Sequence, residues 1–256
     1  MAHNTDFIDV AGCRTEVRRG GSGAPLLFLH GAGGNPGWLP FMETLAESFD
    51  VIAPSHPGFG QSDTPDWLDG IDDVTHFYVE FLETLGLEGV HVAGNSLGGW
   101  IAAEIALRNP SRLASLTLVA AAGIRVKGEP IADTFLWSEE ERTRNLYFDQ
   151  SLAEALLAQP LSPEAEDIAI KNRFASARLA WNPRFHNPQL RKWAHRITLP
   201  TMIVWGKEDR IFPEPYAHAY KELLPQAELR ILPNCGHLPQ VEKTDEFVDA
   251  VRAIAA

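Results

Sequence analysis

A chain of 256 residues, with 45% hydrophobic and 22% charged residues, is long enough for one domain with a sizeable core, and this composition argues against a disordered or fibrous protein. The formal net charge of -12 disfavours nucleic acid as a partner, because phosphate binding needs clustered Lys and Arg. No signal-peptide pattern opens the chain and no apolar run approaches a membrane span, so we expect a cytoplasmic protein. The two cysteines, Cys13 and Cys235, lack CxxC or zinc-type spacing, and we expect both to be reduced and buried.

The strands come first in chain order. The stretch "DFIDV" at residues 6–10 and the polar-alternating "CRTEVRR" at residues 13–19 predict an antiparallel pair at a sheet edge. Continuous apolar runs follow, which are typical of strands covered on both faces of a parallel sheet. These runs occupy residues 25–30, 50–54, 89–94, 115–121, 201–206 and 228–233.

Helical patterns separate the apolar runs. The clearest spans residues 71–86, where apolar residues recur at helical spacing and Gly86 can end the helix. Strand and helix therefore alternate, which is the α/β pattern.

The alternation stops after Gly123 and resumes near Leu199. The residues between read as almost wholly helical, with a capping box at Ser138 and a cap residue before an N1 proline at Ser162 and at Asn187. We therefore predict a core domain formed by residues 1–123 and 197–256, and a helical cap, or lid, formed by residues 124–196.

The stretch "GNSLGG" follows one apolar run and precedes a helical pattern. A sharp strand-to-helix turn crowds the backbone, and Gly94 and Gly98, two residues either side of Ser96, relieve that crowding. The turn would hold Ser96 at a helix N-terminus, where unpaired N–H groups can stabilise negative charge. Ser96 is thus a candidate nucleophile, whereas a serine that merely caps a helix would not need small residues on both sides.

A serine nucleophile needs a histidine base that is held by a carboxylate. Among nine histidines, His237 lies in the Pro-, Asn- and Gly-rich turn "LPNCGHLPQ" after the last predicted strand. The carboxylate is expected after another strand, where Asp209 and its neighbour Glu208 compete in "TMIVWGKEDRIFP". Ser96, Asp209 and His237 then follow the order serine, acid, histidine.

Five stretches together carry a resemblance that covers nearly the whole chain. They are "LHGAGG", "PSHPGFGQSD", "GNSLGG", "WGKEDRIFP" and "NCGHLPQVEKTDEF". With them the chain resembles the α/β-hydrolase fold enzymes. The resemblance implies a mostly parallel, twisted sheet of about eight strands, with helices on both faces and an inserted helical cap.

The resemblance also implies roles for single residues. The position of Asp209 is that of the family's triad acid, which favours it over Glu208. The loop from His30 to Gly34 matches the family's HGxxG motif, so the backbone N–H of Ala32 is expected in the oxyanion hole beside that of Leu97. His30 itself is expected to order the loop rather than to transfer protons.

The expected reaction is acyl transfer through Ser96, without a metal or cofactor. A serine nucleophile argues against the dehalogenase and epoxide hydrolase branches, which use aspartate. Hydrolases of C–C bonds in ring-fission products are similar too, but they carry methionine where this chain has Leu97 and Trp where it has Leu238. We therefore predict a carboxylesterase, with the C–C hydrolase and a receptor-like binding protein with little turnover as alternatives.

Substrate choice is expected to depend on the cap and on apolar residues beside the triad. The candidates are Trp100, Ile211, Phe212 and Leu238, each of which could instead be core packing. Their apolar character predicts an ester of a small to medium, largely apolar acid. We expect a small-molecule substrate as the only partner, and a monomer or homodimer.

Overall fold

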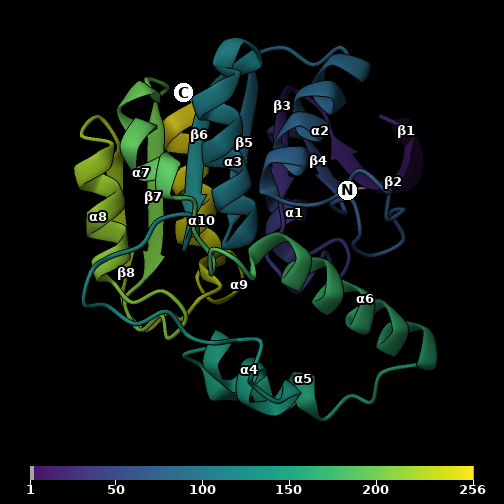
Figure 1. Ribbon diagram of the computed structural model, residues 1–256, viewed down its shortest axis with the longest axis vertical. Coiled ribbons are helices and arrows are strands. Elements are labelled where there is room, and N and C mark those ends of the chain that lie inside the picture. The colour runs from purple at the N-terminus through teal and green to yellow at the C-terminus, as the bar shows by residue number, and fades with distance from the viewer. Residues whose placement is uncertain (1–2, 256) are drawn as a thin grey trace.

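The computed structural model describes residues 3–255, and within them eight strands form one sheet in the order β1-β2-β4-β3-β5-β6-β7-β8 (Figure 1). The strands are β1 (His3–Val10), β2 (Cys13–Gly21), β3 (Ala24–Leu29), β4 (Phe49–Pro54), β5 (Val90–Asn95), β6 (Leu113–Val119), β7 (Thr201–Gly206) and β8 (Glu228–Leu232). β2 pairs antiparallel with β1 and with β4, and all other neighbours are parallel. The predicted mostly parallel sheet with an antiparallel pair at its edge is confirmed.

Helices cover both faces of the sheet, as predicted. They are α1 (Pro40–Leu45), α2 (Ile71–Thr84), α3 (Leu97–Arg108), α4 (Glu139–Leu146), α5 (Gln150–Leu157), α6 (Pro163–Ala180), α7 (Pro188–Trp193), α8 (Pro215–Leu223), α9 (Pro239–Glu242) and α10 (Thr244–Ala255). α2, α3 and α8 contribute to the larger buried apolar cluster, while α1 and α10 contribute to a second cluster on the other face. Burial of this apolar surface is the main force that holds the layers together.

The segment between β6 and β7 carries α4 to α7, and we call residues 124–196 the cap segment. In Figure 1, α4, α5 and α6 lie beyond the carboxyl ends of the parallel strands. The predicted caps are confirmed, since Ser138, Ser162 and Asn187 each accept a backbone N–H at a helix start. The prediction of an almost wholly helical segment is wrong for residues 124–137, which form turns and irregular chain.

The reason for this difference is local. Gly128 adopts the left-handed conformation with φ of 89°, and Pro130 follows two residues later. A left-handed glycine ends regular helix and a proline lacks the N–H that a helix interior needs.

The two cysteines, Cys13 and Cys235, are free and buried, as predicted.

Candidate active site

The turn that holds Ser96 joins β5 to α3, the strand–turn–helix arrangement that the sequence predicts. Ser96 adopts φ of 54° and ψ of -113°, a strained conformation for a residue with a side chain. A Cβ on Gly94 would lie 2.2 Å from the Gly98 carbonyl oxygen, and one on Gly98 would lie 2.1 Å from that of Leu29. The small residues around Ser96 are therefore required by close backbone approach on both sides.

The loops after β7 and β8 bring a carboxylate to a histidine. The Nδ1–H of His237 donates to Asp209 Oδ2 over 2.8 Å, and both side chains are buried. The other carboxylate oxygen of Asp209 accepts from the backbone N–H groups of Ile211 and Phe212, at 2.7 and 3.1 Å. This set of bonds uses both oxygens of Asp209 as acceptors and turns the Nδ1 side of the His237 ring towards the carboxylate, so Nε2 is the ring nitrogen left to exchange a proton with a substrate or a nucleophile.

Glu208, the competing carboxylate, has a different partner. Its Oε2 accepts from the backbone N–H of Cys235, 3.0 Å away, and so fastens the loop that presents His237. Of the two candidates the structure brings Asp209 to His237.

Asn95 is a residue of this site that the sequence reasoning missed. Its Nδ2 donates to the carbonyl oxygen of His237 at 3.2 Å and to that of Val119 at 3.3 Å. It thereby ties the residue before Ser96 to the histidine loop. Its place next to the serine was the only signal in the sequence.

The turn from Gly31 to Gly34 lies against Ser96. A Cβ on Gly31 would lie 3.3 Å from Cβ of Ser96, and the Gly34 N–H donates to the Gly31 carbonyl over 3.0 Å. The N–H of Leu97 belongs to the first turn of α3, where backbone N–H groups have no intrahelical partner. Ala32 and Leu97 are thus both on segments that meet at the serine.

Two further histidines form a buried chain beneath this turn. His30 Nδ1–H donates to the Gly31 carbonyl at 2.7 Å, while His30 Nε2 accepts from the His56 backbone N–H at 3.0 Å. His56 Nε2–H donates to the His30 carbonyl at 2.9 Å, and the Tyr78 hydroxyl donates to His56 Nδ1 at 2.5 Å. Every ring nitrogen therefore has a partner that suits a neutral ring.

Burial keeps both rings neutral. Desolvation lowers the pKa of His30 to about 4 and lowers that of His56 well below its ordinary value. The two rings lie 3.7 Å apart between centroids. This arrangement suits a scaffold for the loop, in line with the expectation that His30 orders it.

The cap segment is tied to the histidine loop. The His237 N–H donates to the Leu146 carbonyl over 2.8 Å. The Glu242 carboxylate accepts from Gly236 N–H at 2.7 Å and from the N–H groups of Phe148 and Asp149 at 2.8 and 2.9 Å. Sequence reasoning missed this link, because it joins residues more than 90 positions apart.

The predicted pocket side chains lie in different surroundings. Ile211 and Phe212 are buried, and the Phe212 ring lies 5.7 Å from the His237 ring between centroids. Leu238 is half-buried directly after His237. Trp100 is buried, and its indole N–H donates at 3.0 Å to Glu104 of the same helix, which also accepts from Asn187 at the start of α7.

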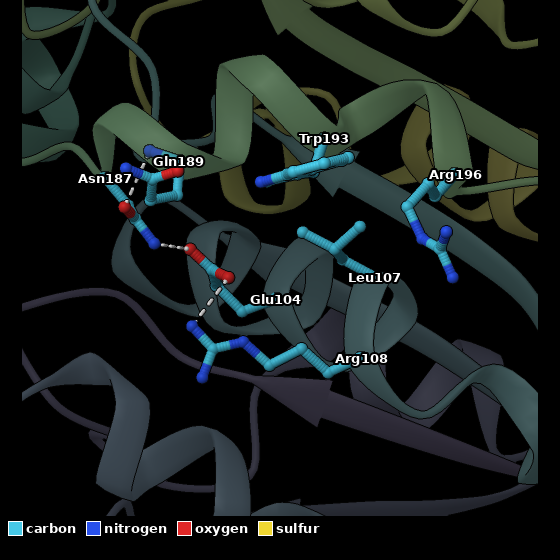
Figure 2. A pocket seen from close by; sticks show the side chains of 7 residues that line it. All are labelled: Glu104, Leu107, Arg108, Asn187, Gln189, Trp193 and Arg196. Atoms are coloured by element: carbon cyan, nitrogen blue, oxygen red, sulfur yellow. Dashed lines mark hydrogen bonds and ion pairs between the residues drawn. The ribbon is translucent and has the colours of Figure 1, made fainter.

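Figure 2 shows an open pocket on this α3–α7 flank, where Glu104 faces Asn187 and Arg108. Asn187 donates to Glu104 over 2.7 Å and Arg108 lies 3.3 Å from its second oxygen. Glu104 lies eight positions after Ser96 along α3, or about 12 Å at the helical rise. The pocket is therefore separate from the serine, and its polar contacts fasten α7 to the helix that follows Ser96.

Two features are absent from residues 3–255. No helix there is long and apolar enough to cross a membrane. No group of three His, Cys, Asp or Glu side chains there is arranged to hold a metal ion.

Comparison with curated proteins gives relatives of at least three kinds. The chain is 31% identical to a 2-hydroxymuconate semialdehyde hydrolase of Pseudomonas sp. (strain CF600), over 95% of this chain and 91% of that protein. It is 29% identical to Lipase 1 of Psychrobacter immobilis, over 91% of this chain and 77% of the lipase. It is also 28% identical to the dihydrolipoyllysine-residue acetyltransferase component of the acetoin cleaving system of Cupriavidus necator, over 94% of this chain but only 66% of that protein.

Solved structures give the same fold. The crystal structure of a membrane phospholipase A, described as a bacterial virulence factor, matches with a TM-score of 0.76 and 28% identity, over 98% of this chain and 85% of that one. The alpha/beta hydrolase family matches residues 26–250 of the sequence. The eight-stranded sheet, the strand–turn–helix at Ser96 and this match agree, and the chain belongs to the alpha/beta hydrolase family.

Proposed function

We propose that the protein is a serine hydrolase that cleaves an ester of a small to medium, largely apolar carboxylic acid through an acyl-enzyme on Ser96. The observation that carries this proposal is the buried 2.8 Å contact between His237 and Asp209, which lies at the carboxyl ends of the parallel strands, as does the strained turn that presents Ser96. A histidine oriented by a carboxylate is the usual activator of a serine nucleophile. We also propose that residues 124–196 act as a cap over the carboxyl ends of these strands.

The proposed reaction has two halves. His237 Nε2 takes the proton of the Ser96 hydroxyl as Oγ bonds to the substrate carbonyl carbon, and the same proton then passes to the departing alcohol. Water next attacks the acyl-enzyme, gives its proton to His237 and releases the acid as Ser96 recovers its hydrogen. Asp209 stabilises the imidazolium that forms in each half.

The N–H groups of Ala32 and Leu97 would stabilise the oxyanion in both halves. Removing one such donor typically costs about 3 to 4 kcal/mol of transition-state stabilisation. The Phe212 ring lies beside the His237 ring, and its neighbour Ile211 and the residue after His237, Leu238, are also apolar, which supports an uncharged or largely apolar substrate.

Hydrolysis of a C–C bond in a ring-fission product is the second candidate. The 31% identity to a 2-hydroxymuconate semialdehyde hydrolase supports it, as the lipase relative supports ester hydrolysis. The two candidates share the same serine, histidine and aspartate, so the substrate decides between them. A binding protein with little turnover is the third reading, and the buried His237–Asp209 pair, together with a serine in the strained turn after β5, counts against it.

A fluorophosphonate probe tests the nucleophile. We expect the wild type to be labelled and Ser96→Ala to stay unlabelled, because only the serine oxygen can bond to phosphorus. Ser111→Ala, which changes an exposed serine after α3, serves as the matched control and should label like the wild type. Equal labelling of the wild type and Ser96→Ala would overturn the proposal.

A substrate panel then separates the two reactions. We expect p-nitrophenyl esters of short and medium acyl chains to be hydrolysed faster than a charged ring-fission dienoate. Rapid turnover of the dienoate with no hydrolysis of the esters would instead establish the C–C hydrolase. Labelling without turnover of any compound would favour the binding protein.

A further inference from the structure

The inner face of α6 carries two polar side chains that are almost completely buried. Asn172 is 6% exposed and Ser176 is 3% exposed, and they lie one helical turn apart. Buried polar groups cost free energy unless they are hydrogen-bonded, so their partners indicate what this face of the helix is built to hold.

Both side chains bind the turn that contains Ala32. The Ser176 hydroxyl donates to the Ala32 carbonyl over 2.7 Å, and Nδ2 of Asn172 donates to the next carbonyl, that of Gly33, over 2.9 Å. Asn172 Oδ1 accepts in turn from the backbone N–H of Gly60 at 2.9 Å. Two consecutive peptide groups of the turn are thus fixed by a helix of the cap segment.

The fit of the turn against α6 is close. Gly34 has φ of 92°, and a Cβ there would lie 2.3 Å from Nδ2 of Asn172. The amide of Asn172 therefore lies directly against the backbone at a position that only glycine can occupy without displacement. This contact leaves the turn little freedom to rotate while α6 stays in place.

We propose that Asn172 and Ser176 are positioning residues for the oxyanion hole: they hold the 31–34 turn so that the N–H of Ala32 faces the carbonyl oxygen of the substrate. This proposal rests on the proposed function, in which Ala32 is an oxyanion donor. The cap segment then contributes to the rate of the reaction as well as covering the substrate.

The turn is held from two sides in this arrangement. From the main sheet, His30 donates to the Gly31 carbonyl, which belongs to the same peptide group as the N–H of Ala32. From the cap segment, Ser176 and Asn172 take the two following carbonyls. A donor held in advance needs no rearrangement as charge develops, which is the condition for strong oxyanion stabilisation.

The test uses the full-length protein with Asn172→Asp and Ser176→Ala. Aspartate keeps an acceptor for the Gly60 N–H but places a carboxylate oxygen against the Gly33 carbonyl, so it replaces the attractive contact with the turn by a repulsive one. Arg178→Gln is the matched control, since Arg178 of the same helix donates to the Leu68 carbonyl, outside the turn, over 3.1 Å.

We expect kcat for the best p-nitrophenyl ester, and the rate of labelling by the fluorophosphonate, to fall about 10- to 100-fold in both variants, because a small misplacement of a catalytic group costs up to about 100-fold. KM should change by less than about threefold, since the turn acts on the transition state. Ser176→Thr, which keeps the hydroxyl, should recover most of the rate, and Arg178→Gln should match the wild type.

Hydrogen exchange of the 28–37 segment supplies a readout that does not depend on catalysis. We expect faster exchange there in Asn172→Asp and Ser176→Ala than in Arg178→Gln, with thermal melts confirming that all three remain folded. Wild-type rates of labelling and of exchange in both variants would overturn the positioning role alone. A wild type that neither labels nor hydrolyses esters would overturn the proposed function, and the catalytic part of this role with it.

Discussion

His237 and the pair His30–His56 are all buried and all follow parallel strands at their carboxyl ends, yet their hydrogen-bond partners differ. His237 donates its Nδ1–H to a carboxylate, whereas His30 donates to a backbone carbonyl and His56 accepts from a tyrosine hydroxyl. A carboxylate can stabilise a positive charge that appears on the ring, and neutral partners cannot do so to the same extent. Burial of a histidine therefore says little about its role, and the partner of Nδ1 says more.

Among the changes that test this difference between the histidines, loss of the Asp209 carboxylate should have the largest effect. We expect Asp209→Asn to lower kcat for ester hydrolysis about 10,000-fold, as the equivalent change does in the serine protease triad, because an amide would favour the wrong ring tautomer. Steady-state kinetics on p-nitrophenyl esters measures the effect. Glu208→Gln keeps an acceptor for the Cys235 N–H and should lose less than about tenfold. A loss in Glu208→Gln as large as in Asp209→Asn would contradict the assignment.

The neutral pair should make stability depend on pH. The pKa of His30 is about 4 in the folded protein, below the ordinary value of 6.5, so between these values the unfolded chain binds more protons than the folded one. The free energy of unfolding should reach its full value above about pH 7 and fall as the pH drops towards 4, by about 3 kcal/mol from His30 alone. Urea unfolding at pH 7, 6 and 5 measures this slope.

The control for this slope is an exposed histidine, His218, which lies 3.2 Å from Glu214. His218→Gln changes an exposed side chain and should leave the pH dependence as in the wild type, whereas His30→Gln should flatten it. Carboxylates that titrate below pH 5 contribute equally to all three proteins, so the difference between them isolates His30. Parallel slopes for the wild type and His30→Gln would show that a lowered pKa of His30 does not contribute to the pH dependence.

The smallest effect is expected at Tyr78, the last member of the hydrogen-bonded series that begins at His30. Tyr78→Phe removes the hydroxyl that donates to His56 Nδ1 and leaves that buried nitrogen without its donor. The free energy of unfolding should fall by about 1 to 3 kcal/mol, with ester hydrolysis reduced less than about tenfold. Tyr147→Phe, in the cap segment, is the control. Identical urea midpoints for Tyr78→Phe and the wild type would show that the hydrogen bonds through His30, His56 and Tyr78 do not stabilise the loop.

The sequence predicted those parts of the molecule that depend on local pattern. Apolar runs marked the parallel strands, because strands covered on both faces must be apolar throughout. Gly94 and Gly98 marked the turn at Ser96, because close backbone approach excludes any side chain there. The cap residues Ser138, Ser162 and Asn187 marked three helix starts, because each binds a backbone N–H of its own helix.

Contacts between distant segments were beyond reach of the same reasoning. Asn172 and Ser176 bind residues 139 and 144 positions away, and nothing in the helix around them distinguishes them from ordinary polar residues. The chain of His30, His56 and Tyr78 likewise depends on how β3, β4 and α2 pack. Polar side chains of this kind acquire a role only when the fold supplies their partner.

The turn at residues 209–212 has a consequence for changing what the protein accepts. Ile211 and Phe212 are candidates for recognising the substrate through their side chains, while their backbone N–H groups hold the carboxylate of Asp209. A substitution that shifts this backbone to fit a new substrate also shifts the acid. Selection for a new substrate should therefore accumulate changes first at positions such as Leu238, whose backbone N–H is not part of this turn, and engineered libraries are best begun there.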